Sequence, residues 1–403
     1  MKQFVHLGDL HLGTGQNNLD ALDEAIREVE GMPNLAGWMW PGDIFHAKST
    51  IESRNALIPR VVDMASVAPV VICYGNHDAP GDLDFLAALD AKHAIHVVSR
   101  PKVVHLWGSN AHVFVLPYPT KGALLAMGAD VKATAAQCLD AICLDGAQQL
   151  EKLGGASMVI GHLNIAGSIS STGQPQIGKE IEMSRETLAR FKDMPVVLNH
   201  IHKAQTIGAG DAFYAGSLCR LNWGEVEEKR FLITGFDDGR ATGGSSWSGY
   251  QGDGPTACCG DHDWDILSRP LISSPPMYHV EHPRSGAWHV KRGPEGEYLE
   301  PPDSWAGNRV RVRYEFSPED DKQAVEAYLR SEFRDALELK LEPVVQPAGV
   351  VRAPEVAEAT SLNDKVAAWC KLQGVEFTMG VGEKLAAMTT TGRDELLSIL
   401  ESK

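Results

Sequence analysis

The sequence predicts an α/β fold, and three observations in its N-terminal part support that class. First, short apolar runs that read as buried strands lie at residues 4–7, 35–40 and 69–74. Second, apolar residues recur at helical spacing between Leu19 and Val29, and a further helix is expected over residues 53–65. Third, each strand is followed by Asp, Asn or His side chains. The order is therefore β-α-β-α-β, with parallel strands whose carboxyl ends share one edge of a sheet.

The composition is that of an ordinary globular protein. The chain has 403 residues, of which 43% are hydrophobic and 22% charged, and this length predicts about two or three domains. No apolar run approaches the ~18 residues of a membrane span, and the N-terminus enters strand-like sequence without a signal-peptide pattern. The seven cysteines are odd in number and include no Cys-x-x-Cys pair, which indicates a reducing compartment without a thiolate zinc site. We therefore expect a cytoplasmic protein that does not enter a membrane.

The net charge of −16 argues against a protein that grips nucleic acid over a broad basic face, because neutralising phosphates requires clustered Lys and Arg. It does not exclude an enzyme that cleaves phosphate esters. Divalent cations can dominate the local field of an acidic protein, and a partner subunit can supply the basic surface.

Ligand-type side chains follow the three N-terminal strands. Asp9 and His11 leave the first strand on the same side, Asp43 follows the second, and the string Gly-Asn-His-Asp with Asn76 and His77 follows the third. A capping Asp or a turn explains one such strand end. Three of them in register within a β-α-β-α-β order point instead to a site at the edge of the sheet.

Two later strands repeat the pattern. The apolar run at residues 157–161 ends in His162, and the run at 195–198 ends in Asn199, His200, Ile201 and His202. Two divalent ions held about 3.5–4 Å apart need a shared carboxylate together with imidazole and amide donors, and such ions activate a water molecule and neutralise phosphate oxygens. The residues that suit this chemistry are Asp9, His11, Asp43, Asn76, His77, His162, His200 and His202.

The order and types of these residues resemble the calcineurin-like metallophosphoesterase superfamily, whose pattern is Asp-x-His, Gly-Asp, Gly-Asn-His-Asp/Glu, His and Gly-His-x-His. One position departs, because Asn199 stands where Gly normally allows close backbone approach. The resemblance implies a β-sandwich flanked by helices, with a smaller α+β capping domain and C-terminal helices. It implies that Asp43 bridges two ions, manganese or alternatively magnesium. It assigns Asp9, His11 and His202 to one ion and Asn76, His162 and His200 to the other.

By the same resemblance, His77 is not a ligand but positions the phosphate and stabilises the transition state or protonates the leaving oxygen. Within the superfamily, residues 4–13 and 214–231 are similar to the nuclease subunit of the SbcC–SbcD DNA-repair complex of bacteria and its phage counterparts. His46, three residues after Asp43, matches an extra histidine often found in that subunit; it either helps to place DNA for exonuclease cutting or is a surface histidine at a helix start.

The narrower resemblance implies a two-metal DNA nuclease, acting as an exonuclease on duplex ends and as an endonuclease on single strands. It also implies a homodimer and a coiled-coil ATPase partner similar to SbcC. Two other readings use the same residues: a phosphodiesterase or phosphatase for small phosphoesters, and a DNA-end scaffold that binds metal without cutting. A transition-state histidine at position 77 argues against the scaffold.

Composition and resemblance together divide the chain into five segments. These are a nuclease domain at 1–240, a Gly- and Ser-rich loop or insertion at 241–263, a DNA-capping domain at 264–345, a linker at 346–360 and a helical partner-binding tail at 361–403.

The capping domain is expected to contain a β-α-β unit. Residues 309–316 alternate, with Arg309, Arg311 and Arg313 on one face, and this row either contacts phosphates or is the solvated side of an edge strand. Ser317 is the predicted N-cap of the helix that follows.

The tail is expected to form two helices, one starting at Ser361 and one over residues 394–400. Their apolar faces either fold back on this chain or pack on the ATPase partner.

Overall fold

A computed structural model describes most of the chain. The described residues are 2–14, 18–120, 122, 124, 134–169, 181–191, 194–208, 211–225, 227–236, 257–258, 264–271, 273–283, 288–291, 298–317, 319–345 and 353–390. They group into two compact units, one of Met1–Tyr314 with Tyr328–Glu342 and the other of Glu315–Ala327 with Pro343–Lys403. Among these residues, no helix combines the length and the hydropathy that a bilayer-spanning segment needs.

The first sheet is mixed. Its strands β1, β2 and β3 are parallel, as predicted, and β4 continues this parallel set, whereas β13 and β15 run antiparallel to their neighbours. In spatial order the strands are β14 (Ala257–Cys258), β15 (Trp264–Pro270), β13 (Arg230–Phe236), β1 (Lys2–His6), β2 (Leu35–Trp40), β3 (Val70–Cys73) and β4 (Ile95–Val98). Residues 264–270, which the sequence places in the capping domain, thus pair with β13 in this sheet.

The second sheet has the parallel strands β6, β7, β10 and β12 at its centre. Its order is β11 (Gln205–Ile207), β12 (Ala212–Tyr214), β10 (Val196–Asn199), β7 (Ala156–His162), β6 (Ala111–Leu116) and β5 (Lys102–Leu106). A separate parallel pair joins β8 (Asn164–Ile165) and β9 (Glu182–Met183).

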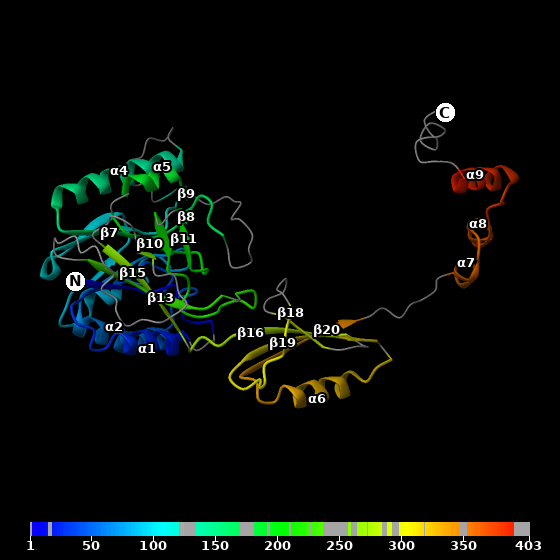
Figure 1. Ribbon diagram of the computed structural model, residues 1–403, viewed down its shortest axis with the longest axis horizontal. Coiled ribbons are helices and arrows are strands. Elements are labelled where there is room, and N and C mark those ends of the chain that lie inside the picture. The colour runs from blue at the N-terminus through cyan, green and yellow to red at the C-terminus, as the bar shows by residue number, and fades with distance from the viewer. Residues whose placement is uncertain are drawn as a thin grey trace. The chain divides into compact units, whose positions relative to one another are not determined.

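The two sheets face each other and are covered on both outer sides by helices (Figure 1). Helices α1 (Asn18–Glu28) and α2 (Ile51–Val67) cover the first sheet, and α4 (Ala135–Leu153) and α5 (Arg185–Leu188) cover the second. The strands alternate accordingly, so that Val5 packs in the helix-facing core and Phe4 in the core between the sheets. Short 3₁₀ helices are η1 (Asp84–Ala88), η2 (Trp107–Ser109) and η3 (Ala189–Phe191). The sandwich flanked by helices that the resemblance implies is therefore confirmed.

A third sheet has the order β18 (Tyr298–Leu299), β17 (His289–Lys291), β16 (Met277–His282), β19 (Arg309–Phe316) and β20 (Glu338–Val345). The expectation of an edge strand at residues 309–316 is wrong, because β19 lies between β16 and β20. Arg309 and Arg311 form ion pairs with Glu338 and Glu342 of β20. Most of the arginine row is thus neutralised by its neighbouring strand.

Helix α6 (Lys322–Glu332) begins later than predicted. Asp321, and not Ser317, acts as its cap, because the Asp321 carboxylate accepts hydrogen bonds from the backbone N–H groups of Gln323 and Ala324 at 3.0 and 3.2 Å. Both residues are good caps, so local sequence did not distinguish them.

In the other unit, α7 (Pro354–Glu358), α8 (Leu362–Leu372) and α9 (Met379–Thr390) follow one another. Ser361 caps α8 as predicted, because its hydroxyl accepts from the Asp364 N–H at 3.1 Å. The helix predicted over 394–400 and all of segment 241–263 except Ala257–Cys258 lie outside the described residues.

Candidate metal centre

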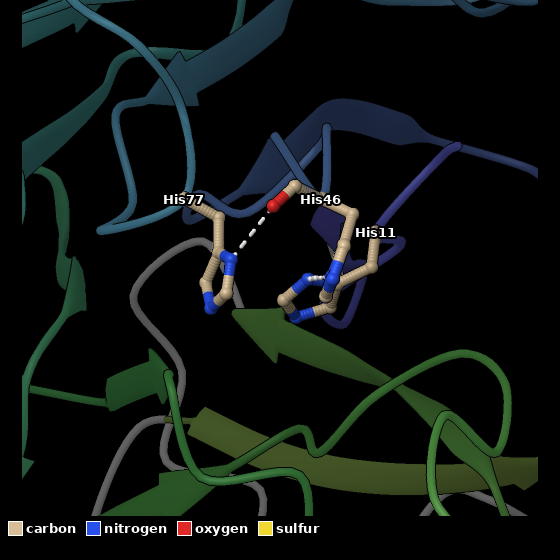
Figure 2. Close-up of side chains that lie close together, drawn as sticks. All are labelled: His11, His46 and His77. Atoms are coloured by element: carbon tan, nitrogen blue, oxygen red, sulfur yellow. Dashed lines mark hydrogen bonds between the residues drawn. The ribbon is translucent and has the colours of Figure 1, made fainter. Parts of the chain in front are cut away.

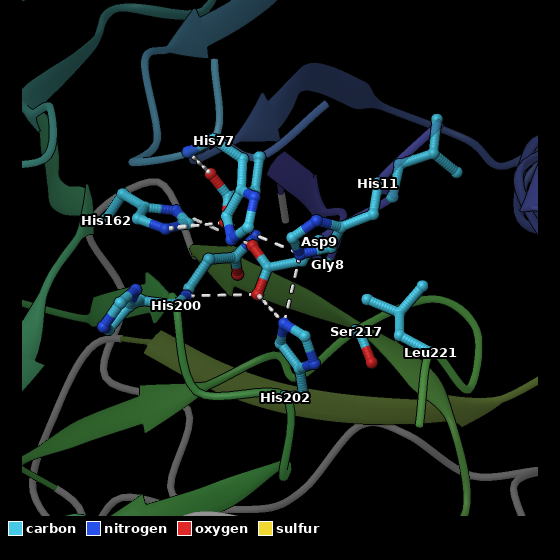
Figure 3. Close-up of polar contacts among 12 residues, drawn as sticks. Gly8, Asp9, His11, His77, His162, His200, His202, Ser217 and Leu221 are labelled. Carbon is cyan, nitrogen blue, oxygen red and sulfur yellow. Dashed lines mark hydrogen bonds and ion pairs between the residues drawn. The ribbon is translucent and has the colours of Figure 1, made fainter. Parts of the chain in front are cut away.

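The predicted site residues gather where strands of both sheets end (Figure 3). The ends of β1, β2 and β3 supply Asp9 and His11, Asp43, and Asn76 and His77, respectively. The ends of β7 and β10 bring His162, His200 and His202 from the second sheet. Because parallel strands of each sheet present their carboxyl ends at one edge, five segments that are distant in sequence meet there.

The backbone at this edge adopts uncommon conformations. His11, Asp43 and His200 have φ angles of 49°, 50° and 97°, a region that side chains other than Gly seldom occupy. Such conformations concentrate at functional sites, where the surrounding structure imposes them. Here the first two strand ends hold each other, because the backbone N–H groups of Leu10 and His11 both donate to the Asp43 carbonyl at 3.1 and 3.0 Å.

Close approach of two loops needs glycine at two positions. A Cβ atom on Gly42 would lie 2.7 Å from Nδ1 of His162, and one on Gly75 would collide with the Asp43 carboxylate. Asp78 joins the same loops from behind, since its carboxylate accepts from the N–H groups of Phe45 and Gly75 at 3.0 and 2.9 Å. Burial raises the pKa of Asp78 to about 6.

One half of the centre is formed by Asp9, His11 and His202. The Nε2 atoms of His11 and His202 lie 3.1 Å apart, and His202 Nε2 lies 3.9 Å from the Asp9 carboxylate. Burial lowers the pKa of His11 to about 3, so its ring is neutral and carries a lone pair. Ligand atoms of these three side chains all lie within 4.8 Å of one another, which suits one cation.

The other half is formed by Asn76, His162 and His200. Oδ1 of Asn76 lies 2.9 Å from both His162 Nε2 and His200 Nδ1. His162 donates from Nδ1 to the Pro41 carbonyl at 2.8 Å, which leaves Nε2 directed at Asn76 and at Asp43, 3.3 Å away. This partner fixes the tautomer of His162.

Asp43 lies between the two halves. Its Oδ2 is 3.5 Å from His11 Nε2 and 3.3 Å from His162 Nε2. Burial opposes ionisation of Asp43, but His162 and His11 outweigh it and hold its pKa below the usual range. Burial in turn opposes protonation of His162, and the Asp43 carboxylate raises its pKa to about 9. The Asp43 carboxylate thus favours a positive charge beside it, either the proton on His162 or a cation.

The surroundings of Asp9 show whether the site suits a metal ion. It is fully buried, and burial raises its pKa to about 7 against the opposing effect of His162. Among the described residues, its Oδ1 atom accepts no hydrogen bond. A buried carboxylate oxygen with no donor, beside imidazole nitrogens with lone pairs, is the donor set that a divalent cation satisfies.

His77 and His46 stand beside this set (Figure 2). The His77 backbone N–H donates to Asp43 Oδ1 at 2.9 Å, and its Nδ1 donates to the His46 carbonyl at 2.8 Å. The two rings are stacked with centroids 5.1 Å apart, and His46 Nδ1 lies 3.3 Å from His11 Nδ1. His46 is exposed and His77 half-buried, so both face solvent at the rim.

All of the predicted site residues therefore lie in one cluster, and their roles as ligands stay a prediction. Sequence reasoning gave no role to Asn18, Asp78, Glu225 or Lys229, although each supports the cluster. Asn18 donates to the His11 carbonyl at 2.9 Å, and Glu225 accepts from His202. Asp78 carried a signal as part of the Gly-Asn-His-Asp string, and Glu225 and Lys229 lie in the segment 214–231 that resembles the SbcD-type subunit, but neither pattern assigned these residues a role.

A match to one known protein family agrees with this geometry. Residues 2–202 match the calcineurin-like phosphoesterase family. No curated protein matches the chain. Similar solved structures include GAP50, the anchor in the inner membrane complex of Plasmodium, with 16% identity, a TM-score of 0.36, and coverage of 54% of this chain and 72% of that one. The protein TT1561 of Thermus thermophilus has 12% identity, a TM-score of 0.35, and coverage of 57% of this chain and 93% of that one.

The family match coincides with the part of the chain that supplies every strand end of the cluster, from Asp9 to His202. Members of this family are metal-dependent hydrolases of phosphoesters, which is the chemistry that the buried carboxylates and imidazoles suit. Residues 2–202 of this chain are therefore a calcineurin-like phosphoesterase domain.

Proposed function

We propose that the chain is a two-metal DNA nuclease that works with a coiled-coil ATPase similar to SbcC. The observation that carries the catalytic part is the convergence of ligand side chains from five strand ends around Asp43, with His77 at the exposed rim. Asp9, His11 and His202 hold one ion, Asn76, His162 and His200 hold the other, and Asp43 contacts both. Manganese is the proposed metal, with magnesium as the alternative.

The ions, when bound, supply positive charge for the phosphate oxygens and lower the pKa of a water molecule. The side chains do the rest. His77 Nδ1 is occupied by the His46 carbonyl, so the nitrogen that faces a substrate is Nε2. In the protonated ring this nitrogen donates to a phosphate oxygen or gives its proton to the leaving oxygen. The backbone N–H of His77 holds Asp43, which ties the proton donor to the bridging carboxylate.

Two features support DNA as the substrate. Residues 214–231 resemble the SbcD-type nuclease subunit, and small-molecule phosphodiesterases do not need this segment. The same segment contacts the start of the third sheet, because the Arg220 N–H donates to the Ser274 hydroxyl at 3.0 Å and its guanidinium to the Pro275 carbonyl at 3.2 Å. We assign that sheet to a DNA-capping domain. His46, next to His77, is proposed to help place the DNA strand.

The tail supports the partner proposal. In α8, Leu362, Trp369 and Leu372 expose 46%, 53% and 47% of their surface, which is unusual for large apolar side chains on one helix. The resemblance places an ATPase on this segment and predicts a homodimer. Replacing Trp369 with Ala should weaken binding of such an ATPase while leaving metal binding unchanged, as measured by calorimetry.

The deciding experiment is nuclease activity on linear duplex and circular single-stranded DNA with manganese. We expect His77→Ala to lower the rate by about 10²- to 10⁴-fold without changing metal content. His93→Ala is the matched control, because His93 is also half-buried and lies outside the cluster. Turnover of a small phosphodiester with no cutting of either DNA would keep the metal centre and remove the nuclease assignment. Metal binding without hydrolysis of any ester would favour the scaffold.

A further inference from the structure

We infer that Glu225 and Lys229 are positioning residues for His202, and that they determine the affinity of one of the two metal ions but not of the other. This inference rests on the ligand set of the proposed function. Both residues lie in the segment 214–231 that resembles the SbcD-type subunit, but their role follows from contacts that form only in the folded chain.

Glu225 contacts the ring of His202 from the side opposite the metal centre. It is 2% exposed, and its Oε1 accepts from His202 Nδ1 at 2.8 Å. With the proton on Nδ1, the lone pair is on Nε2, the nitrogen that faces His11 Nε2 at 3.1 Å. A histidine ligand is normally oriented in this way by an acceptor on its second nitrogen.

Lys229 holds Glu225 in place. Its Nζ lies 2.7 Å from Glu225 Oε2, and the residue is 1% exposed. The ammonium group also donates to the Ser217 hydroxyl at 2.8 Å and to the His202 carbonyl at 3.2 Å. Lys229 therefore supports His202 in two ways. Its ammonium group pairs with the Glu225 carboxylate that contacts the His202 ring, and it donates directly to the His202 carbonyl. A buried carboxylate needs such a countercharge, and a buried ammonium needs these acceptors.

The segment that carries Glu225 is itself anchored. Arg220, which is 6% exposed, donates from Nε to the Glu225 carbonyl at 3.1 Å and from its Nη2 to the Glu227 carbonyl at 2.7 Å. The Leu221 N–H donates to Glu225 Oε2 at 3.1 Å. The Glu225 carboxylate is therefore fixed in position. Because the His202 ring donates to it, the ring is held in one orientation.

The second half of the centre is oriented differently. His162 donates from Nδ1 to a backbone carbonyl, that of Pro41, at 2.8 Å. A change at Glu225 leaves this contact intact. The effect of removing Glu225 should therefore be confined to the ion held by Asp9, His11 and His202.

The test measures Mn²⁺ binding to the full chain without DNA, by electron paramagnetic resonance and calorimetry, together with the ¹⁵N chemical shifts of His202. For Glu225→Ala we expect about 10- to 100-fold weaker binding of one ion and a change of less than about threefold for the other. The His202 signals should change from the Nδ1–H form to a mixture of tautomers. Lys229→Met should show the same selective loss, and Lys229→Arg should restore most of it.

Glu227→Gln is the matched control. Glu227 contacts Lys229 at 2.9 Å, and its replacement keeps the contact between Glu225 and His202. We expect both ions to bind as in the wild type. If Glu225→Ala does not fold, Glu225→Gln replaces it: its amide oxygen still accepts from His202, but its amide group faces the Lys229 ammonium, so one ion should bind more weakly.

Equal weakening of both ions, or of neither, would overturn the inference. Fewer than two ions bound to the wild type would overturn the ligand set of the proposed function instead. Absence of DNA cutting, with two ions bound to the wild type and one weakened in Glu225→Ala, would remove only the nuclease assignment.

Discussion

The two halves of the metal centre use similar side chains but differ in how firmly they are held. In the half with Asp9 and His11, these residues are 0% and 1% exposed, and Asn18 and Glu225 hold the ligand-bearing segments from behind. In the other half, His162 is fully buried, but Asn76 is exposed and His200 half-buried. We call them the closed half and the open half.

Because of this difference, we expect the two halves to bind their ions with different affinities. A buried carboxylate and two imidazoles, one of them oriented by Glu225, favour tight binding and slow exchange of an ion in the closed half. A neutral amide at the surface favours weaker binding in the open half. His77 and His46 lie beside His11 of the closed half, with ring centroids 4.7 and 5.4 Å from the His11 ring.

The largest effect should come from Asp43→Asn, which removes the charge shared by both halves. Because Asp43 lies within 3.5 Å of His11 and His162, both ions should bind more than about 100-fold more weakly, and hydrolysis should become undetectable. Metal content after dialysis and calorimetry measure this. Asp211→Asn, at an exposed ion pair with Arg185, is the control. Retention of one ion at wild-type affinity would show that Asp43 belongs to one half only.

A smaller, one-sided effect should distinguish the halves directly. His202→Ala should weaken one ion by about 100-fold, whereas Asn76→Ala should weaken the other by about 10-fold, because an exposed amide contributes less than an oriented imidazole. Paired Mn²⁺ titrations of the two variants measure both values. Equal losses would contradict the distinction between closed and open halves.

The smallest effect concerns the acid stability of β1, the strand that precedes Asp9 and His11 of the closed half. His6 in β1 is fully buried, its Nε2 lies 2.8 Å from the Thr234 hydroxyl, and burial lowers its pKa to about 3. The folded state therefore keeps His6 neutral while the unfolded chain binds a proton below about pH 6.5. Stability should thus fall as the pH falls from about 6.5 towards 3, by about 1.4 kcal/mol per pH unit for this group.

Urea unfolding of metal-free protein between pH 7 and 4 tests this, with His6→Gln as the variant that keeps a polar partner for Thr234. The free energy of unfolding of the variant should fall less steeply with acidification, by about 1.4 kcal/mol per pH unit. His93→Gln should keep the wild-type slope. Parallel slopes for all three proteins would mean that His6 does not cause the loss.

The site was more predictable than its support, and the reason is the range of the interactions. Each ligand-type residue directly follows an apolar strand, so the pattern at Asp9 or His162 is visible locally. Glu225 lies 23 residues from His202, and its contact with that ring forms only when the segment folds back. Lys229 lies in the same family-like segment, but the resemblance does not show that it is buried, with 1% of its surface exposed.

The fold shows the same limit. The parallel strands β1, β2 and β3 were predictable because their apolar runs alternate with helices. The pairing of residues 264–270 with β13 was not, because a strand does not indicate locally which sheet it joins. Similarly, Ser317 and Asp321 are both favourable caps, so the sequence alone did not locate the start of α6.

The glycine at position 75 offers a practical reagent. A single added methyl group there would collide with the Asp43 carboxylate and with the Asp43 backbone nitrogen, while every proposed ligand stays in the sequence. Gly75→Ala should therefore yield a protein that does not bind metal ions, although it differs from the wild type by one carbon atom and carries no change of charge. Such a protein can serve as an inactive reference for binding and assembly studies.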